Sequence, residues 1–389
     1  MADDAGLWLA LGASCFPLLW MIRHDRPRLE QTLTWLKARG VDFVRAFGDV
    51  GGPTWADRTV DMDAATYASD LMDALALVSD LNLRVAWTLF AGPAGAHSPD
   101  WYQRKAVAFA ERLETRRETV QYVEIRNEGE GLDDATMRAC ASILRAHLPG
   151  VPAALCGTPE SGLPDLYRGS DATLATVHWD RAYGERGWRP VRQPWGYYAL
   201  DGMPEAHVDN EPIGIDSSGS DEDDPVKLAA AAVTAWLTGE SAYVLHHGAG
   251  IRAGGAADLA KGRQANVWDQ PALEPALALI TGARAILPAD LPAWSRHGHA
   301  WPTHPLAIET AVGDAVESGA DGCNRCYAAT RGDQAVVFVT GIRGRFRAPS
   351  KAGAFTVSRP SGDAWLPAGS PPTTFDLSEA ESSVALLIR

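Results

Sequence analysis

Short apolar segments alternate with amphipathic segments from residue 7 to about residue 285 of the chain. We predict strands where the apolar runs lie, at residues 7–13, 41–47, 83–90, 121–127, 152–157, 173–179, 205–210 and 241–247. Apolar positions at helical spacing predict helices between them, at 26–39, 64–81, 99–116, 133–148 and 225–238. Strands and helices that alternate at intervals of roughly 30 residues are typical of a (β/α)8 TIM barrel.

The residues at the helix ends support this interpretation. Gly40 follows the first of these helices and is a natural C-terminal cap. Asp224 is a natural N-cap, and Pro225 stands in the first helical turn. We therefore interpret the acidic run 221–224 as a solvated helix cap rather than a calcium site. The alternative, a doubly wound sheet, would normally have a glycine-rich turn after the first strand, and GASCFP at 12–17 lacks that spacing.

The pattern changes after about residue 305. Segments such as RCYAATRGDQAVVFVTG and SSVALLIR are short alternating strands that Gly, Pro and Ser separate. We predict a catalytic barrel over residues 1–304 and a small antiparallel β-sandwich-like domain over residues 305–389. We expect the second domain to brace the barrel and to supply no catalytic carboxylate.

Composition excludes several classes of partner. The net charge of −14 disfavours binding to nucleic acid or to anionic membranes, which requires clustered Lys and Arg. The apolar segment GLWLALGASCFPLLWMI lacks a preceding basic region, so we predict a buried strand and its following loop rather than a signal peptide. We expect a protein that is cytoplasmic, or secreted with its leader removed.

The chemistry-bearing motifs point away from cofactors. The five cysteines are scattered, and Cys323 and Cys326 form one isolated pair without a second pair or a nearby His, so we interpret them as structural thiols. The sequence has no P-loop, no H-E-x-x-H and no G-x-S-x-G motif. We expect no cofactor and no metal.

Two Asn-Glu pairs follow predicted strands. Asn127-Glu128 ends the fourth strand and Asn210-Glu211 ends the seventh. In a barrel, both strand ends open onto the same mouth, where active sites of this fold lie. Two carboxylates that face one cleft are the minimum requirement for cleaving a glycosidic bond, because one must carry a proton and the other must stay ionised.

The segment YVEIRNEGEG resembles the fourth-strand signature of clan A glycoside hydrolases, especially those near family 39. The resemblance implies a retaining O-glycosidase in which Glu128 is the general acid/base, Glu211 is the nucleophile and Asn127 binds the sugar 2-hydroxyl. It further implies that Arg45 supports the nucleophile and that His178 is the histidine common after the sixth strand.

The sequence departs from this pattern at three points. Asp180 stands where the clan often has a tyrosine, although Tyr183 or Tyr197 could serve instead. His246 and His247 replace a tryptophan after the eighth strand, and Gly129 replaces a frequent proline.

Glu124 lies inside the predicted strand 121–127. We predict that it is a buried structural carboxylate that pairs with Arg126 or Arg45, since an unpaired buried carboxylate is costly.

The loops after the sixth and eighth strands are candidates for substrate binding. The segment 179–201 is rich in aromatic residues that could stack on sugars, and its arginines admit an acidic glycan. The segment 246–268 after the eighth strand is expected to form the other wall. We predict an oligosaccharide or glycoside substrate held by Trp179, Tyr183, Trp188, Trp195, His246 and Trp268, in addition to Arg45, Asn127 and His178.

Two other functions remain open at this point. A catalytically silent carbohydrate-binding barrel would keep the aromatic residues but lose one carboxylate, and both are present. A metal-dependent barrel hydrolase could use His24, His178, His246 and His247, but that class usually has an H-x-H pair after the first strand, and LALGAS has none.

Overall fold

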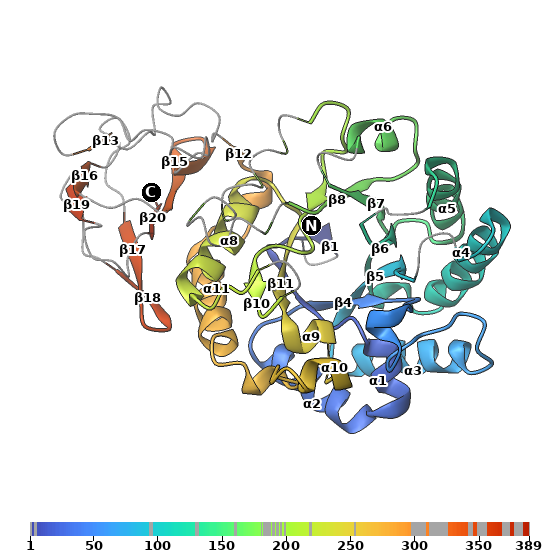
Figure 1. Cartoon of the computed structure of the whole chain (residues 1–389). Coiled ribbons are helices and arrows are strands. Elements are labelled where there is room, and N and C mark those ends of the chain that lie inside the picture. The colour runs from blue at the N-terminus through green and yellow to red at the C-terminus, as the bar shows by residue number, and fades with distance from the viewer. Residues whose placement is uncertain are drawn as a thin grey trace.

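The computed structural model contains a nine-stranded parallel sheet that curls around a central axis, with helices outside it (Figure 1). It describes residues 2–3, 6–92, 96–128, 132–158, 162–179, 181, 188, 191, 194, 197, 200–217, 220–252, 254–296, 309–310, 326–340, 345–347, 356–367, 374–376 and 384–388. Along the sheet, the strands follow the chain order: β3 (Ala10–Ser14), β4 (Phe43–Phe47), β5 (Arg84–Phe90), β6 (Val120–Arg126), β7 (Ala153–Gly157), β8 (Leu174–Val177) and β9 (His207–Val208). On its other side β3 pairs with β11 (Ala242–His247), and β11 pairs with the short β10 (Gly214–Ile215).

The barrel closes between β9 and the start of β11. The backbone N–H of Ser241 donates to the carbonyl of His207 at 2.8 Å. The eight principal strands therefore form the predicted barrel, with helices following the strands in sequence. The main helices are α1 (Leu18–His24), α2 (Arg26–Ala38), α3 (Tyr67–Asp80), α4 (Pro99–Glu114), α5 (Asp134–His147), α6 (Leu163–Tyr167), α8 (Pro225–Leu237) and α11 (Leu273–Ile286).

The helix ends follow from the sequence. The Asp224 carboxylate accepts from the backbone N–H of Val226 at 2.9 Å, so Asp224 caps α8 as expected. Gly40 follows α2 with a φ of 82°, a left-handed conformation that glycine adopts without strain. The prediction of a loop directly after the first strand was wrong in part, because α1 begins at Leu18.

A layer of small and aromatic side chains fills the lower part of the barrel. Every principal strand contributes to this cluster. A Cβ on Gly12 would lie 2.4 Å from Phe43 Cζ, so the ring occupies the space that a side chain at position 12 would need. The members of this apolar layer are Ala10, Phe43, Ala86, Tyr122, Ala154, Leu174, Val208, Ala242 and Val244.

The C-terminal part of the chain forms antiparallel sheets beside α8 and α11 (Figure 1). The indole N–H of Trp365 donates to the carbonyl of Leu279 on α11 at 2.8 Å, which ties the sheet to the barrel helices. The larger sheet comprises β12 (Ser295–Arg296), β14 (Cys326–Arg331), β15 (Gln334–Thr340), β20 (Val384–Ile388), β17 (Thr356–Ser361) and β18 (Ala364–Pro367). The smaller comprises β13 (Glu309–Thr310), β16 (Arg345–Arg347) and β19 (Thr374–Asp376).

The remaining short elements lie at the chain start and in the loops. They are β1 (Ala2–Asp3), β2 (Gly6–Leu7), η1 (Pro53–Trp55), η2 (Arg117–Thr119), α9 (Gly248–Arg252), α10 (Ala256–Leu259), η6 (Val267–Asp269) and η7 (Leu291–Ala293). None of the helices in the described part of the chain combines the length and the apolar character that crossing a bilayer requires.

Candidate active site

A polar layer lies inside the barrel directly above the apolar layer. Alternate residues of a strand point to the same side, so the residue two positions after the last apolar-layer member of each strand also faces the barrel axis, except in β3, where Gly12 intervenes and Ser14 follows. At these positions the sequence changes from apolar to polar. The polar layer consists of Ser14, Arg45, Thr88, Glu124, Cys156, Thr176, Asn210 and His246, all of which are buried.

Arg45 is the centre of this layer. Its side chain is fully buried, and its Nη1 donates to Glu211 Oε1 at 2.7 Å. Its Nη2 donates to Glu124 Oε2 at 2.7 Å and to Asn127 Oδ1 at 2.8 Å. One guanidinium therefore orients three side chains, which come from β6, from the residue after β6 and from the turn after β9.

Glu124 is the buried structural carboxylate that the sequence suggested, and Arg45 is its cationic partner. Its Oε2 also accepts from the Thr88 hydroxyl at 2.5 Å, and its Oε1 accepts from the Asn210 amide at 2.9 Å. Burial favours the neutral form, but Arg45 outweighs it and lowers the pKa of Glu124.

Glu211 follows β9 and lies at the floor of the mouth. Its backbone N–H donates to the Asp209 carboxylate at 3.1 Å, which fixes the turn after the strand. Burial opposes ionisation of Glu211, but His178, Arg45 and Arg181 outweigh it and hold its pKa well below the usual value.

Glu128 lies at the end of β6 in an unusual backbone conformation. Its φ is 56°, in the left-handed region that non-glycine residues rarely adopt, at a cost of about 1–3 kcal/mol. Its side chain is 44% exposed. Glu128 Oε1 lies 3.9 Å from His178 Nδ1 and 3.8 Å from Arg181 Nη2.

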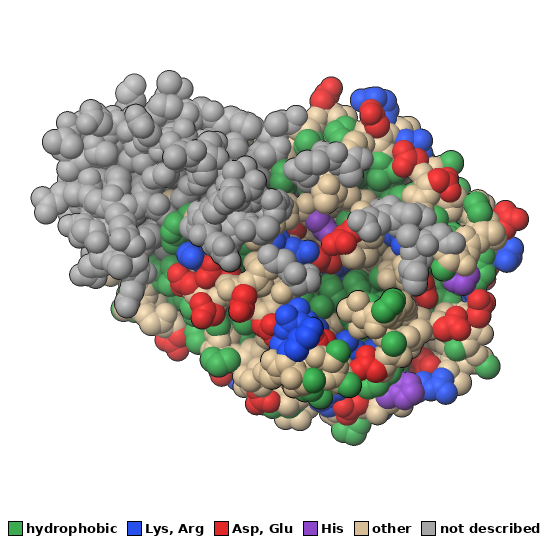
Figure 2. All heavy atoms as spheres, viewed as in Figure 1, with side chains coloured by type: hydrophobic (Ala, Val, Ile, Leu, Met, Phe, Trp, Pro, Cys, Tyr) green, Lys and Arg blue, Asp and Glu red, His purple; other side chains and the backbone are tan. Residues whose placement is uncertain are grey.

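The two glutamates face one another across the mouth. One carboxylate oxygen of Glu128, one of Glu211 and a ring nitrogen of His178 lie within 4.8 Å of one another. The face of the molecule in Figure 2 shows acidic, basic and histidine side chains together in a central hollow. The arrangement can hold a small group between a buried carboxylate and an exposed one.

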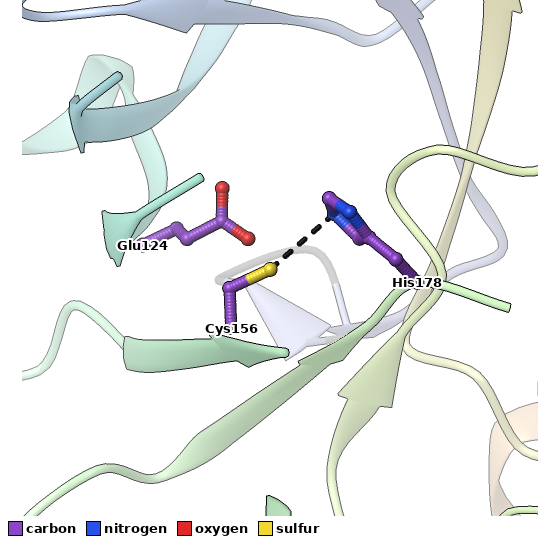
Figure 3. A group of neighbouring side chains, drawn as sticks. All are labelled: Glu124, Cys156 and His178. Carbon is purple, nitrogen blue, oxygen red and sulfur yellow. Dashed lines mark hydrogen bonds between the residues drawn. The ribbon is translucent and has the colours of Figure 1, made fainter. Parts of the chain in front are cut away.

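His178 connects the polar layer to Glu128. Its Nε2 lies 2.7 Å from Asn210 Oδ1 and 3.4 Å from the Cys156 sulfur, and Figure 3 shows Cys156 and Glu124 directed toward its ring. Burial opposes a charge on the imidazole, but Cys156 and Glu211 outweigh it and raise the pKa of His178. With Nε2 held by Asn210, the other ring nitrogen, Nδ1, lies 3.9 Å from Glu128 Oε1.

Arg181 is the second cation at Glu211. It follows β8 by four residues, and its Nη1 donates to Glu211 Oε2 at 2.6 Å. The same nitrogen lies 3.2 Å from His246 Nε2, while His246 Nδ1 lies 2.9 Å from the Ser14 hydroxyl. Since a guanidinium can only donate, His246 Nε2 accepts and the ring proton is on Nδ1.

Two groups of side chains in the described residues have the spacing of metal ligands. They are Glu124 with Cys156 and His178, and Glu128 with His178 and Glu211. Both carboxylate oxygens of Glu124 already accept hydrogen bonds, and burial raises the pKa of the Cys156 thiol, so it is a poor ligand. Arg181 brings positive charge into the second group. We therefore assign no metal site.

Of the four histidines of the metal hypothesis, His178 and His246 lie beside Glu211, and His24 and His247 have other surroundings. His24 is exposed on α1 and stacks on Trp20. His247 Nδ1 accepts from the backbone N–H of Gly250 at 3.0 Å. Of the four, only His178 belongs to the ligand-spaced groups in the described part of the chain, and it belongs to both.

The predicted stacking residues are only partly placed. Trp179, Trp188 and Trp268 are partly buried and pack against the barrel core. Tyr183, Trp195 and Asp180 lie outside the described residues. Tyr197, one of the two tyrosines that could serve in place of the clan's tyrosine, is buried, and its hydroxyl donates to the carbonyl of Pro204.

Solved structures with this fold include glycoside hydrolases. A structure described as a glycoside hydrolase has a TM-score of 0.70 at 13% identity, with 100% of this chain and 96% of the other covered. A glycoside hydrolase family 5 protein from Bacteroides vulgatus ATCC 8482 has a TM-score of 0.70 at 13% identity, over 99% and 90% of the two chains. The endo-β-1,4-mannanase from Thermotoga petrophila has a TM-score of 0.50 at 11% identity, over 98% and 91%.

At such low identity these similarities establish the fold. The family named among these structures is family 5, whereas the sequence motif pointed toward family 39. No family model matches the sequence, and no curated protein matches it.

Sequence reasoning missed two residues of the site. Asn210 bonds both Glu124 and His178, and Arg181 bonds Glu211. Asn210 could have been found from its position two residues after Val208 in the apolar layer. Arg181 was noted for its charge, but its contact with Glu211 depends on the path of a loop, for which the sequence carries no periodic signal.

Proposed function

We propose that the protein is a retaining O-glycosidase of clan A type, in which Glu211 is the nucleophile and Glu128 the general acid/base. The observation that carries the proposal is that one carboxylate oxygen of each glutamate lies within 4.8 Å of the other at the mouth of a closed barrel. Retaining glycosidases hold their carboxyl groups about 5–5.5 Å apart, whereas inverting enzymes leave room for a water molecule.

The surroundings of the two glutamates support the assignment of roles. A nucleophile must be ionised, and two guanidinium groups bond Glu211. An acid/base must exchange its proton with water in every turnover, and Glu128 is exposed at the mouth. The first step forms a bond from Glu211 to the anomeric carbon while the leaving oxygen takes the Glu128 proton. In the second step, Glu128 removes a proton from the water that displaces Glu211.

The neighbouring side chains fit binding of a neutral sugar. Asn127 Oδ1 accepts a hydrogen bond from Arg45. This contact leaves the NH2 group of Asn127 to donate to the 2-hydroxyl of a sugar. Around the mouth, the carboxylates of Glu124, Glu128 and Glu211 are offset by Arg45, Arg181 and His178. The fold shared with a family 5 protein supports the clan rather than family 39.

The test is a screen of aryl glycosides that differ in sugar, followed by NMR of the first-formed anomer. We expect turnover of at least one β-glycoside or α-glycoside with retention of configuration, unchanged by a metal chelator. Inversion would contradict the retaining mechanism. Loss of activity on chelation would favour the metal-dependent hydrolase, and binding without turnover would favour the silent barrel.

A further inference from the structure

Arg181 stands out among the residues of the mouth because it contacts both proposed catalytic carboxylates. Its Nη1 is 2.6 Å from Glu211 Oε2 and its Nη2 is 3.8 Å from Glu128 Oε1. Its side chain is 11% exposed, so little water screens these interactions. Arg45 bonds the other oxygen of Glu211, and the nucleophile is therefore held from both sides.

His246 determines where the guanidinium lies. Its ring is fully buried, and burial lowers its pKa well below the usual value, so it is neutral. Its Nε2 accepts from Arg181 and its Nδ1–H donates to Ser14 on β3. This series of hydrogen bonds runs from Ser14 on β3 to His246 on β11, then to Arg181 and Glu211. It therefore links β3 and β11 to the turn after β9 through the loop after β8.

We propose that Arg181 is a positioning residue of the reaction: held by neutral His246, it fixes the Glu211 carboxylate through Oε2 and reaches toward Glu128, so that one cation links the two carboxylates. This inference rests on the proposed function. At this strand end the clan often has a tyrosine, whereas this sequence has Asp180 followed by Arg181.

Other charged groups also face Glu211, and a test must separate Arg181 from them. The cations are Arg45 on β4 and His178 after β8. Glu128 after β6 lies across the mouth, and Asp209 after β9 bonds the backbone of Glu211. The groups that remain in any Arg181 variant are Arg45, His178, His246, Glu128, Glu124 and Asp209.

The experiment measures kcat/KM against pH for three variants of the full chain on an activated aryl glycoside. Removal of a cation in contact with a carboxylate raises the pKa of that carboxylate by about one to three units. Since Glu211 must be ionised to attack, we expect Arg181→Gln and Arg181→Met to move the acidic limb to higher pH by about that amount. In Arg181→Lys, which keeps the positive charge, the acidic limb of the profile should stay within about half a pH unit of its position in the unaltered protein.

Arg168→Gln is the matched control. Arg168 is exposed and pairs with Asp165 after β7, so the variant removes one positive charge without touching the mouth. Its acidic limb should coincide with that of the unaltered protein. A shift as large as that of Arg181→Gln would indicate a general charge effect and overturn the proposal.

His246→Phe supplies an independent test, because it removes the acceptor for Arg181 without changing the formal charge of the site. We expect the acidic limb of kcat/KM to move to higher pH, by less than it moves in Arg181→Gln. An unchanged limb in active Arg181 and His246 variants would overturn the inference while leaving the proposed function intact. Absence of glycosidase activity in the unaltered protein would instead overturn the proposed function.

Discussion

The ends of β6 and β9 each present a glutamate to the barrel mouth, but their surroundings differ. The side chain of Glu211 is 4% exposed, and each of its oxygens accepts from a guanidinium. The side chain of Glu128 is 44% exposed and meets cations only at 3.8 Å and 3.9 Å. The two residues share a motif and a position on the strand, so it is the environment that distinguishes them.

The difference has a physical cause in the barrel interior. Glu211 lies against the polar layer, where Arg45 and His178 supply charge that water cannot screen. Glu128 projects above that layer from a backbone with φ of 56°. A carboxylate surrounded by buried cations is suited to stay ionised, and one that reaches solvent is suited to gain and lose a proton.

The largest effect should come from Glu211→Ala. Without a group to form the glycosyl-enzyme, hydrolysis of every substrate should fall by a factor on the order of 10⁶, as in hydrolases that lose their nucleophile. Added azide should restore some turnover of an activated substrate and give a glycosyl azide of inverted configuration, which NMR identifies. Glu205→Ala, an exposed glutamate before β9, is the control and should keep full activity. Full activity of Glu211→Ala would place the catalytic pair elsewhere.

Glu128→Ala should have a smaller and substrate-dependent effect. Loss of a general acid typically costs about 10²–10⁴-fold on a poor leaving group. A dinitrophenyl glycoside needs little protonation, so its first step should survive and a burst should precede a slow second step. Azide, which needs no base, should restore turnover with retained configuration. If Glu128→Ala gave the inverted azide and Glu211→Ala the retained one, the roles that we assign to the two strand ends would be exchanged.

The sequence predicts most of this arrangement because the barrel imposes a period of two on its strands. Strand positions place Glu128 and Glu211 at the same mouth, and the Arg45 side chain inside it. The strand period also predicts that Glu124 is buried, and the sequence offers Arg45 or Arg126 as its cationic partner. In the structure Arg45 donates to Glu124, while Arg126 donates to the carbonyl of Gly92.

The loops set the limit of that prediction. The residues after β8 have no apolar period that fixes which side chain returns to the mouth, so Arg181 could not be distinguished from the other arginines of segment 179–201. The first strand was predicted at 7–13 and lies at Ala10–Ser14, because the apolar run continues without a break into α1. The boundary of the C-terminal domain at residue 305 stays a prediction, and β12 joins that sheet from Ser295–Arg296.

Arg45 pairs with the structural carboxylate of Glu124 and with the proposed nucleophile Glu211. Glu124→Gln tests how much the first of these pairs contributes to the free energy of unfolding. Glu124 Oε1 accepts a hydrogen bond from Asn210, and Oε2 accepts from Thr88 and Arg45. In the glutamine variant the NH2 group replaces one of these oxygens, so in either orientation it faces a donor and a hydrogen bond is lost. Breaking a buried charge pair costs about 3–5 kcal/mol, and urea unfolding should show a loss of this size. The exposed pair Arg39–Glu274 provides the control, and Glu274→Gln should cost less than about 1 kcal/mol. Equal losses would mean that the polar layer contributes no more to stability than a surface pair.

The smallest effect concerns Asp209, whose carboxylate accepts a hydrogen bond from the backbone N–H of Glu211. Burial raises the pKa of Asp209 to about 7, against an opposing charge on His178. Because this folded-state pKa lies above the ordinary value of 3.8, the folded protein binds the proton more tightly than the unfolded chain does. The stability from this group is therefore complete below about pH 4 and is lost as the pH rises through 7, at up to about 1.4 kcal/mol per pH unit.

Asp209→Asn removes that titration but keeps an oxygen that can accept from the Glu211 N–H. In urea unfolding at a series of pH values, the variant should gain stability over the unaltered protein steadily from pH 4 to pH 7. Glu240, whose pKa burial and Asp209 also raise, still titrates in the variant, so part of the slope should remain. Asp80→Asn, which alters an exposed residue at the end of α3, should run parallel to the unaltered protein at every pH. If Asp209→Asn also ran parallel, Asp209 would be ionised in the folded protein at neutral pH, and the turn that carries Glu211 would rest on a charged carboxylate rather than a protonated one.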